Sequence, residues 1–594
     1  MCGIVGYLGK GNAKEVVLNG LYKLEYRGYD SAGMSVFNEK NQRFDMYKDV
    51  GRVAHLDSLV QSIDHSPIAI GHTRWATHGK VNQANAHPHF SASERFVVVH
   101  NGVIENYREL KARYLNGHHW VSETDTEVIV QLIERFSDEL SVEEAVKKTV
   151  SLLHGSYALL VLDQDNPERL IAAKHKSPLL IGKSDEGIII ASDLVALAKY
   201  SQVYSPLEDE SIVVINQAEI TLWNRDYVQQ ELTFQPMDFE DDLTELGEYP
   251  HYMLKEIMEQ PLVMRKIVDR YFHDDHIVID EAILEGIRQA DRLYVLAAGT
   301  SMHAGYIGKR LFENLTEKPL EVHIASEFAY HPPVLSAQPF FILISQSGET
   351  ADLRACLSHL KKHHYPSLTI TNVKTSTLAR EATYALELFA GPEIAVASTK
   401  AYTAQIAVLA VLAAKVAHRD AGLRESISEL AAKMEQYLTQ YESVAELVKR
   451  VLTKQNAFYI GRGTDYFVSL EAALKLKEIS YIQAEGFAAG ELKHGTIALI
   501  EEGTPVIALN SEPHVALNTR SNLEEVKSRG AMAVTIATEA VAQEGDDIVL
   551  PNVDPLLVPI MMVLPTQLIA YYAALERGHD IDKPRNLAKS VTVE

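Results

Sequence analysis

Short apolar segments alternate with helix-like segments along the second half of the chain. Four of these apolar segments have the length of a strand, at residues 293–297, 340–344, 367–371 and 385–389. The alternation predicts a parallel sheet with helices on both faces. Because the pattern returns at residues 457–461, we predict two copies of one α/β fold, at roughly 290–425 and 456–575.

The first third of the chain has a different pattern. A helix-like segment at residues 128–140 precedes strand-like segments whose turns carry Asp, Asn and Gly. These strand-like segments are at residues 156–162, 188–191, 212–215 and 220–223. The pattern is compatible with two stacked antiparallel sheets flanked by helices.

An acidic stretch without periodicity, at residues 236–248, separates the two patterns and is the predicted linker. We therefore expect a first domain at residues 2–235. Two α/β domains should follow, at residues 249–425 and 456–584, and residues 585–594 should form a C-terminal tail.

Length and charge limit the function classes. A chain of 594 residues is too long for one core. Its net charge of −24 argues against a nucleic-acid partner, so local donors must hold any anionic ligand. The two cysteines, Cys2 and Cys356, provide no disulfide framework, which fits a reducing cytoplasm.

The sequence offers no candidate for a signal peptide or a membrane span. The N-terminus lacks a basic region followed by an apolar run. The longest apolar stretches, at residues 404–414 and 560–575, are short or contain Pro565, so we expect buried helices and no membrane partner.

The loop at residues 345–350, with the sequence SQSGET, lies between a predicted strand and a predicted helix. Its hydroxyl groups and backbone N–H groups would lie at a helix N-terminus, where the helix dipole favours an anion such as phosphate. An ordinary N-cap is the alternative. Thr300 and Ser301 follow another predicted strand, and Ser398 opens a long apolar helix, so each is a cap or a sugar-phosphate ligand.

Cys2 is the second residue of the chain. Removal of Met1 would give it a free α-amino group, which could act as the base for its own thiol. Taken alone, Cys2 could equally be a small buried cysteine that lies early in the chain.

Further motifs follow Cys2 in order. They are at residues 27–33, 71–79, 86–89, 100–102 and 122–127. With Cys2, these motifs resemble the class II glutamine amidotransferase family over roughly residues 2–235. The resemblance implies an α+β N-terminal-nucleophile hydrolase sandwich with αββα layers, in which Cys2 attacks the glutamine amide.

The resemblance also assigns roles to other residues of this domain. Asn101 and the backbone of Gly102 match the oxyanion hole, which would stabilise the tetrahedral intermediate. Arg74 matches the residue that holds the substrate carboxylate, and Asp125 matches the group that takes the α-amino group. Trp75 matches the residue that gates an ammonia passage. Two neighbouring residues are further candidates for substrate binding, Thr77 and His78.

Simpler roles are possible for each of these residues. Asn101 and Gly102 form a common turn pair, and Asp125 between two threonines could be a helix N-cap. His87 and His89 lack the spacing of a zinc helix, so we expect a structural role for them and no metal.

Charged residues of the last third have the spacing of a catalytic group. Glu471, Lys475 and Glu478 lie on one face of a predicted helix, where a solvated salt-bridge ladder is the alternative. His494 lies on a glycine-flanked loop. Lys589 lies in a terminal tail that could be frayed or could fold over a site, where a desolvated lysine can form a Schiff base.

These motifs resemble the isomerase half of the glucosamine-6-phosphate synthase family, which has two sugar-isomerase domains. The resemblance implies that Lys589 forms an imine with the open keto sugar and that Glu478 moves the proton between C1 and C2. Lys475 would assist Glu478, and Glu471 would lie nearby. His494 would open the sugar ring from the other subunit of a homodimer.

The same resemblance assigns the phosphate site and one tail residue. Arg585 matches a tail residue that helps to position the site. The phosphate would lie on Ser301, Ser345, Gln346, Ser347 and Thr350.

We therefore expect a cytoplasmic enzyme that hydrolyses L-glutamine and channels the ammonia to D-fructose 6-phosphate, giving glucosamine 6-phosphate without a metal or other cofactor. One alternative is another amidotransferase of the same N-terminal class, although the chain has no nucleotide or pyrophosphate loop. The other is a sugar-phosphate sensor without catalysis, for which this acidic chain offers no DNA-reading domain.

Overall fold

The computed structural model describes residues 2–216, 219–237 and 245–592. The chain forms two compact units. The first unit contains the described residues up to Glu245 and those from Ser590 onward, and the second contains Leu246–Lys589. Most of the predicted linker, at residues 238–244, lies outside the described residues, and Pro236 belongs to a strand.

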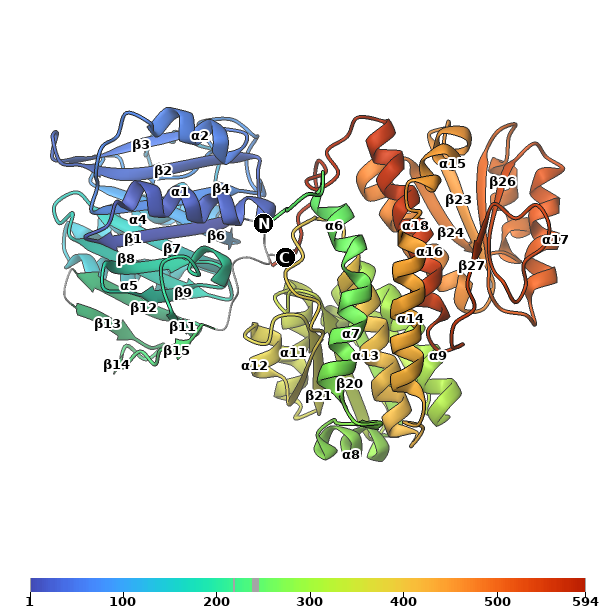
Figure 1. Cartoon of the computed structure of the whole chain (residues 1–594). Coiled ribbons are helices and arrows are strands. Elements are labelled where there is room, and N and C mark those ends of the chain that lie inside the picture. The colour runs from blue at the N-terminus through green and yellow to red at the C-terminus, as the bar shows by residue number, and fades with distance from the viewer. Residues whose placement is uncertain (1, 217–218, 238–244, 593–594) are drawn as a thin grey trace. The chain divides into compact units, whose positions relative to one another are not determined.

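Two antiparallel sheets stack in the first unit (Figure 1). The larger sheet has the strands β1 (Gly3–Gly9), β2 (Ser31–Asn38), β3 (Arg43–Val50), β4 (Ile68–Arg74), β9 (Leu180–Lys183), β10 (Gly187–Ala191), β11 (Val203–Pro206) and β15 (Gln235–Pro236). The smaller sheet has the strands β5 (His89–Phe90), β6 (Phe96–Ile104), β7 (Gly155–Asp163), β8 (Arg169–His175), β12 (Ser211–Asn216), β13 (Glu219–Trp223) and β14 (Gln229–Gln230).

Strand alternation explains why the first unit has layers. On β1, Val5 and Tyr7 face a core shared with α1 (Ala13–Leu24) and α2 (Val53–Val60). Ile4 and Leu8 point to the opposite face, into the core between the two sheets. The outer face of the smaller sheet is covered by α4 (Thr126–Ser137) and α5 (Val142–Leu152). The predicted αββα sandwich is confirmed.

The second unit contains two parallel sheets of five strands each, which confirms the two predicted α/β domains. The first sheet has the order β19–β18–β20–β21–β22, formed by Leu320–Ile324, Arg292–Ala297, Pro339–Ser345, Ser367–Thr371 and Tyr384–Glu387. The second has the order β24–β23–β25–β26–β27, formed by Gln483–Ala488, Asn456–Gly461, Pro505–Asn510, Met532–Thr538 and Ile548–Leu550.

Helices flank both parallel sheets and share one large hydrophobic core (Figure 1). The helices that carry candidate residues are α6 (Tyr252–Met258), α7 (Gln260–Tyr271), α9 (Gly299–Thr316), α11 (Ala351–Lys362), α13 (Lys400–Val416) and α16 (Thr464–Ser480). Helix α9 of the first α/β domain packs against helix α16 of the second, so candidate residues on the two helices can lie close together.

Most predicted elements agree with the structure, and the differences occur at their ends. The strand predicted at residues 385–389 ends at Glu387, because Phe389 adopts a left-handed φ of 52°. Thr300 and Ser301, which follow a strand as predicted, lie in the first turn of α9. Helix α18 (Val558–Glu576) continues through Pro565.

Helix α18 is the one described helix that is long and apolar enough to cross a membrane. The structure buries 83% of its apolar window, so α18 is a core helix, as predicted.

Candidate active site

Cys2 lies directly before β1, a central strand between β10 and β4. The backbone N–H of Trp75 donates a hydrogen bond to Cys2 Sγ at 3.2 Å. Burial raises the pKa of the Cys2 thiol, although the Trp75 N–H and the Arg74 guanidinium act against it. The thiol therefore needs a base before it can attack a carbonyl carbon.

The predicted oxyanion hole lies beside Cys2. Asn101 Nδ2 donates a hydrogen bond to the Cys2 carbonyl oxygen at 3.0 Å. Gly102 has a φ of 138°, and a Cβ atom there would lie 2.0 Å from the Ser156 carbonyl oxygen, so only glycine fits. Both residues pair with β7 within β6, which excludes the turn. A pocket is lined by Cys2, Trp75, Thr77, Asn101, Gly102, Ser177, Pro178 and Thr592.

Arg74 ends β4, and its guanidinium donates hydrogen bonds to the carbonyl oxygens of His78 and Lys80. The carboxylate of Asp125 accepts a hydrogen bond from the Ile104 N–H at 2.7 Å. Asp125 occupies the N-cap position of α4, but its carboxylate makes no cap hydrogen bond to the helix. Burial lowers the pKa of Arg74, but Asp125 and Asp30 lie close enough to Arg74 to act in the opposite direction. A cation that can bind a carboxylate therefore lies near carboxylates that can bind an ammonium group.

Sequence reasoning assigned no role to Asp30. Its carboxylate accepts a hydrogen bond from the Ala76 N–H at 2.8 Å and so fixes the turn that carries Arg74 and Trp75. Its place in the motif at residues 27–33 is the signal that could have identified it.

Four buried histidines lie beside the oxyanion strand. The rings of His72 and His87 stack with centroids 4.1 Å apart, and His89 lies 4.9 Å from His87. The backbone N–H of His100 donates to His87 Nδ1 at 3.3 Å. Burial lowers the pKa of all four, that of His72 to about 3. The cluster is therefore neutral at pH 7.

Acid should destabilise the first unit through this cluster. Above about pH 6.5, the pKa of a histidine in the unfolded chain, the four histidines are neutral in both states, so they cause no loss of stability. Below that pH the unfolded chain binds protons that the folded unit does not bind, so the free energy of unfolding falls. We expect a loss of up to about 1.4 kcal/mol per histidine for each pH unit below about 6.5. Denaturant unfolding followed by tryptophan fluorescence measures this unit selectively, because Trp75, Trp120 and Trp223 all belong to it.

The matched variants are His89→Gln and His65→Gln. His89 is buried, so its replacement should remove one histidine's share of the acid slope. His65 is exposed, so its replacement should leave the slope unchanged. An equal slope in both variants would contradict the assignment.

In the second unit, the loop after β20 folds around its own hydroxyl groups. Ser345 Oγ accepts a hydrogen bond from the Gly348 N–H at 3.0 Å and lies 3.0 Å from Thr350 Oγ1. Gly348 has a φ of 65°, and a Cβ atom there would lie 1.9 Å from Ser376 Oγ. Thr350 occupies the N-cap position of α11, but its side chain makes no cap hydrogen bond to the helix. Gln346 and Ser347 belong to the same turn.

Two of the three charged residues on α16, Glu471 and Lys475, are buried, and Glu478 is partly buried. Lys475 is 1% exposed, and its Nζ lies 2.6 Å from Glu478 Oε2 and 3.5 Å from Glu471 Oε1. Burial alone would lower the pKa of Lys475, but the two carboxylates raise it overall. The solvated ladder is therefore wrong. Thr300 Oγ1 donates to Glu471 Oε1 at 3.0 Å, and His303 Nδ1 lies 2.7 Å from Glu471 Oε2.

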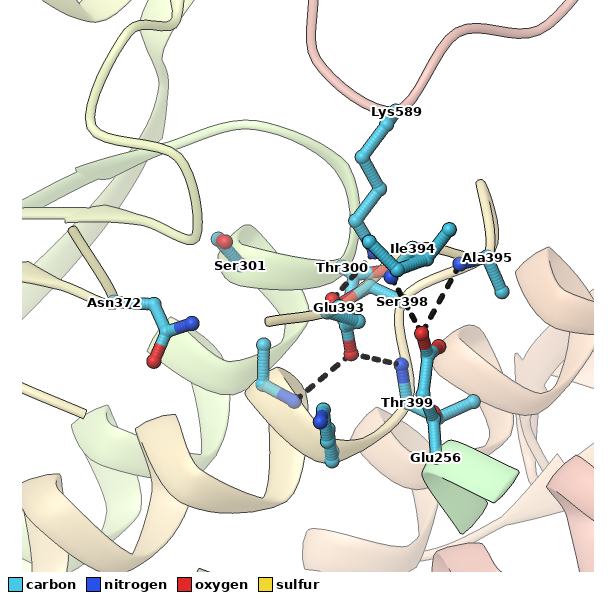
Figure 2. A network of polar contacts seen from close by, with 12 residues as sticks. Glu256, Thr300, Ser301, Asn372, Glu393, Ile394, Ala395, Ser398, Thr399 and Lys589 are labelled. Carbon is cyan, nitrogen blue, oxygen red and sulfur yellow. Dashed lines mark hydrogen bonds and ion pairs between the residues drawn. The ribbon is translucent and has the colours of Figure 1, made fainter. Parts of the chain in front are cut away.

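Sequence reasoning did not identify His303. His303 lies one helical turn after Thr300 on α9, so it shares a helix face with Thr300. That spacing was the signal that could have identified it. Ser301 lies on the first turn of α9, and its Oγ accepts a hydrogen bond from Gln405 of α13 at 2.9 Å. Figure 2 shows Thr300, Ser301 and Ser398 around this region.

Lys589 is not frayed into solvent: its side chain is 3% exposed and forms an ion pair with the buried carboxylate of Glu393 (Figure 2). The hydroxyl of Ser398 donates to the same carboxylate at 2.8 Å. Sequence reasoning missed Glu393, and its place five residues before Ser398 was the available signal. Arg585 packs its guanidinium over the Tyr481 ring at 4.1 Å.

The structure does not bring His494 to the other candidates. His494 is exposed at the end of a short 3-10 helix (Glu491–His494), and no hydrogen bond or ion pair joins it to another candidate among the described residues. In the same described part of the chain, no group of three or more His, Cys, Asp or Glu residues could hold a metal ion.

Comparison with known proteins matches both halves of the chain. A glutamine amidotransferase domain model matches residues 57–237, and an SIS domain model matches residues 286–415 and 452–577. The chain is 54% identical over 604 residues to the glutamine–fructose-6-phosphate aminotransferase [isomerizing] of Shouchella clausii, covering all of both proteins. The enzyme of that name from Listeria monocytogenes is also 54% identical, over 606 residues and the full length of both.

One solved structure supports the second unit. The C-terminal domain of glucosamine-fructose-6-phosphate aminotransferase from Francisella tularensis is 35% identical with a TM-score of 0.55. The match covers 57% of this chain and all of that domain.

Proposed function

The chain belongs to the glutamine–fructose-6-phosphate aminotransferase (isomerizing) family, and from that membership we propose how its residues divide the reaction. The protein hydrolyses glutamine and transfers the nitrogen to fructose 6-phosphate, giving glucosamine 6-phosphate, the first step of the hexosamine pathway. The assignment of residues to each step, the homodimer and the cytoplasmic location are the proposed parts.

Cys2 is the proposed nucleophile of the glutaminase half. Loss of Met1 would leave the Cys2 α-amino group to take the thiol proton, after which the sulfur attacks the glutamine amide carbon. Asn101 and the Gly102 N–H stabilise the oxyanion, ammonia leaves, and water hydrolyses the thioester to glutamate. Arg74 and Asp125 hold the two charged ends of the amino acid, and Thr77 and His78 are further contacts.

The sugar half uses the second unit. The hydroxyls of Ser301, Ser345, Ser347 and Thr350, with Gln346, bind the phosphate at the N-terminus of α11. Thr300 and Ser398 are the further polar residues that we assign to the sugar-phosphate site.

Proton transfer is assigned to the row of charged residues on α16. Lys589 forms an imine at C2, ammonia replaces it, and Glu478 moves a proton between C2 and C1, with Lys475 holding the carboxylate in place. Glu471 anchors Lys475. His494 opens the sugar ring from the partner of a homodimer, and Arg585 holds the tail.

The observation that carries this division is electrostatic. Glu393, the partner of Lys589, is among the groups that raise the pKa of Lys475, so the tail lysine and the α16 row lie within reach of one another's charge. A Schiff-base lysine and a proton-transfer carboxylate need this proximity.

The experiment that tests the proposal supplies the full chain with glutamine and fructose 6-phosphate and measures glutamate and glucosamine 6-phosphate together. The two products should appear in equal amounts without added metal. Glutamate without amino sugar would mean that the acceptor is a different phosphosugar. Sugar-phosphate binding without either product would favour the sensor alternative.

Replacing Trp75 by alanine should uncouple the two half-reactions. The ring of Trp75 packs edge to face on the ring of Tyr29, with the two centroids 6.3 Å apart, and Trp75 also lines the Cys2 pocket. Loss of the indole ring would therefore open a route for ammonia to escape. We expect the ratio of glutamate to amino sugar to rise from one to roughly two or more. Phe37→Ala, which removes an aromatic ring elsewhere in this unit, is the control, and a ratio that stays at one in Trp75→Ala would contradict the gating role.

A further inference from the structure

Glu393 is a buried carboxylate that none of the proposed steps uses. It lies between β22 and α13 and is 4% exposed. Its Oε1 accepts hydrogen bonds from the backbone N–H groups of Thr399 at 2.9 Å and Ala401 at 3.1 Å. Its Oε2 accepts the Ser398 hydroxyl and Lys589 Nζ (Figure 2). Four donors therefore fix both oxygens.

This carboxylate is held in its charged form. Burial alone would raise the pKa of Glu393, but the Lys589 ammonium and the backbone N–H groups at the start of α13 hold it well below its usual value. Neither partner of the pair is open to solvent, since the side chains of Lys589 and Glu393 are 3% and 0% exposed.

The other charged groups around Glu393 are already paired. Lys400 of α13 lies 2.6 Å from Glu259, and Lys475 of α16 is bound by the carboxylates of its own helix. Glu256 of α6 accepts hydrogen bonds from the Ile394 and Ala395 N–H groups, and burial together with the charge of Glu393 raises its pKa well above the usual range. Glu393 is therefore the carboxylate that pairs directly with Lys589, and Glu256 is bonded to backbone N–H groups.

We propose that Glu393 is the counter-ion of Lys589 throughout its covalent cycle, first for the free ammonium and then for the protonated imine. This inference rests on the proposed imine role of Lys589. It adds a second residue to that step and explains how a buried nitrogen can remain positive while its bonding changes.

The charge at the lysine nitrogen does not change when the imine forms. The Lys589 ammonium and the C2 ketone give a protonated imine and one water: the new C=N bond forms, the C=O bond breaks, and two of the three N–H protons leave with the oxygen. Ammonia then adds at C2, and the lysine leaves as a neutral amine while the substrate becomes the iminium. The iminium loses one proton overall as it becomes the neutral amino sugar, and Lys589 takes up one proton and returns to Glu393 as the ammonium.

A buried cation without a partner costs several kcal/mol, so a fixed carboxylate favours the protonated imine over the neutral one. A protonated imine is also the more electrophilic form. The carboxylate, held by α13, therefore stabilises the species that ammonia must attack.

The test traps the imine with borohydride in the full chain supplied with fructose 6-phosphate, between about pH 6 and pH 9. The reduced sugar adduct on the tail peptide is measured by mass. Replacing Glu393 by glutamine keeps the hydrogen-bond acceptor for α13 but removes the charge. We expect about tenfold to hundredfold less adduct at about pH 8, with the alkaline limb moved to lower pH.

The matched control is Glu259→Gln, which removes a carboxylate from a different buried lysine, Lys400, and should leave the trapping profile unmoved. Lys589→Arg should give no adduct and so identifies the site. If the natural chain makes amino sugar but no adduct forms at Lys589, the proposed imine role fails. If the natural chain is trapped and Glu393→Gln gives the same pH profile, Glu393 is only a helix cap and the counter-ion proposal is wrong.

Thermal unfolding shows whether Glu393→Gln is folded. Glu393→Asp keeps the charge but withdraws it by one methylene, so it should shift the profile in the same direction by a smaller factor of about three. Where the glutamine variant does not fold, an unmoved profile in the aspartate variant overturns the proposal.

Discussion

Replacing Cys2 by alanine is expected to abolish glutamine-dependent synthesis of glucosamine 6-phosphate. The Cys2 sulfur is the thiol of the described pocket that also contains the Asn101 and Gly102 donors. Without it no thioester forms, and glutamate and amino sugar should both fall by about ten-thousandfold. Steady-state assays of both products in the same sample measure the loss.

The controls separate lost chemistry from lost structure. Cys356→Ala replaces the other cysteine, which is buried in the second unit, and should leave the glutaminase rate within about twofold. Ammonium salts supplied to Cys2→Ala should restore some amino sugar, because the sugar half remains intact. Persistent glutamate formation in Cys2→Ala would assign the nucleophile to a different group.

Local patterns in the sequence predicted the elements that hold these residues. The apolar run before residues 345–350 predicted β20, and the helix-like pattern after it predicted the start of α11. Strands and helices can be told apart in this way because apolar residues recur every two positions in a strand and about every 3.6 in a helix. The end of β22 could not be predicted, because the apolar residues at its end contain no residue type that signals the left-handed φ of Phe389.

The pairing of charges was only partly predictable. Helical spacing places Glu471 beside Lys475, since residues four apart share a face. The contacts of Glu471 with Thr300 and His303 join residues about 170 positions apart, and those of Glu393 with Lys589 join residues 196 positions apart. Such contacts depend on how α9, α13 and α16 pack, which a single sequence does not encode in any local pattern.

Burial was the other missing quantity. A helix face with alternating charge signs is usually solvated, and only the packing of α16 against its neighbours, among them α18, β24 and α9, shows that Lys475 is enclosed. Enclosure changes the chemistry, because a buried ion pair fixes protonation states that an exposed pair would leave free.

Replacing Lys589 by arginine is expected to stop the sugar reaction while glutamine hydrolysis continues. Arginine keeps a cation for Glu393, so the ion pair and the fold of the tail should survive. A guanidinium cannot form the imine at C2, so the amino sugar should fall by about a thousandfold or more. The measurement is glutamate and glucosamine 6-phosphate from the same reaction, where glutamate should now exceed amino sugar.

The arginine variant distinguishes covalent chemistry from charge, because a lysine that served only as a phosphate or carboxylate partner would be largely replaced by arginine. Lys583→Arg, two residues before the tail begins, is the matched control and should keep the two products equal. Near-normal amino sugar in Lys589→Arg would show that the ketone reacts with ammonia directly, and it would remove the need for a counter-ion at Glu393. Loss of amino sugar together with persistent sugar-phosphate binding would place Lys589 in the chemical step itself.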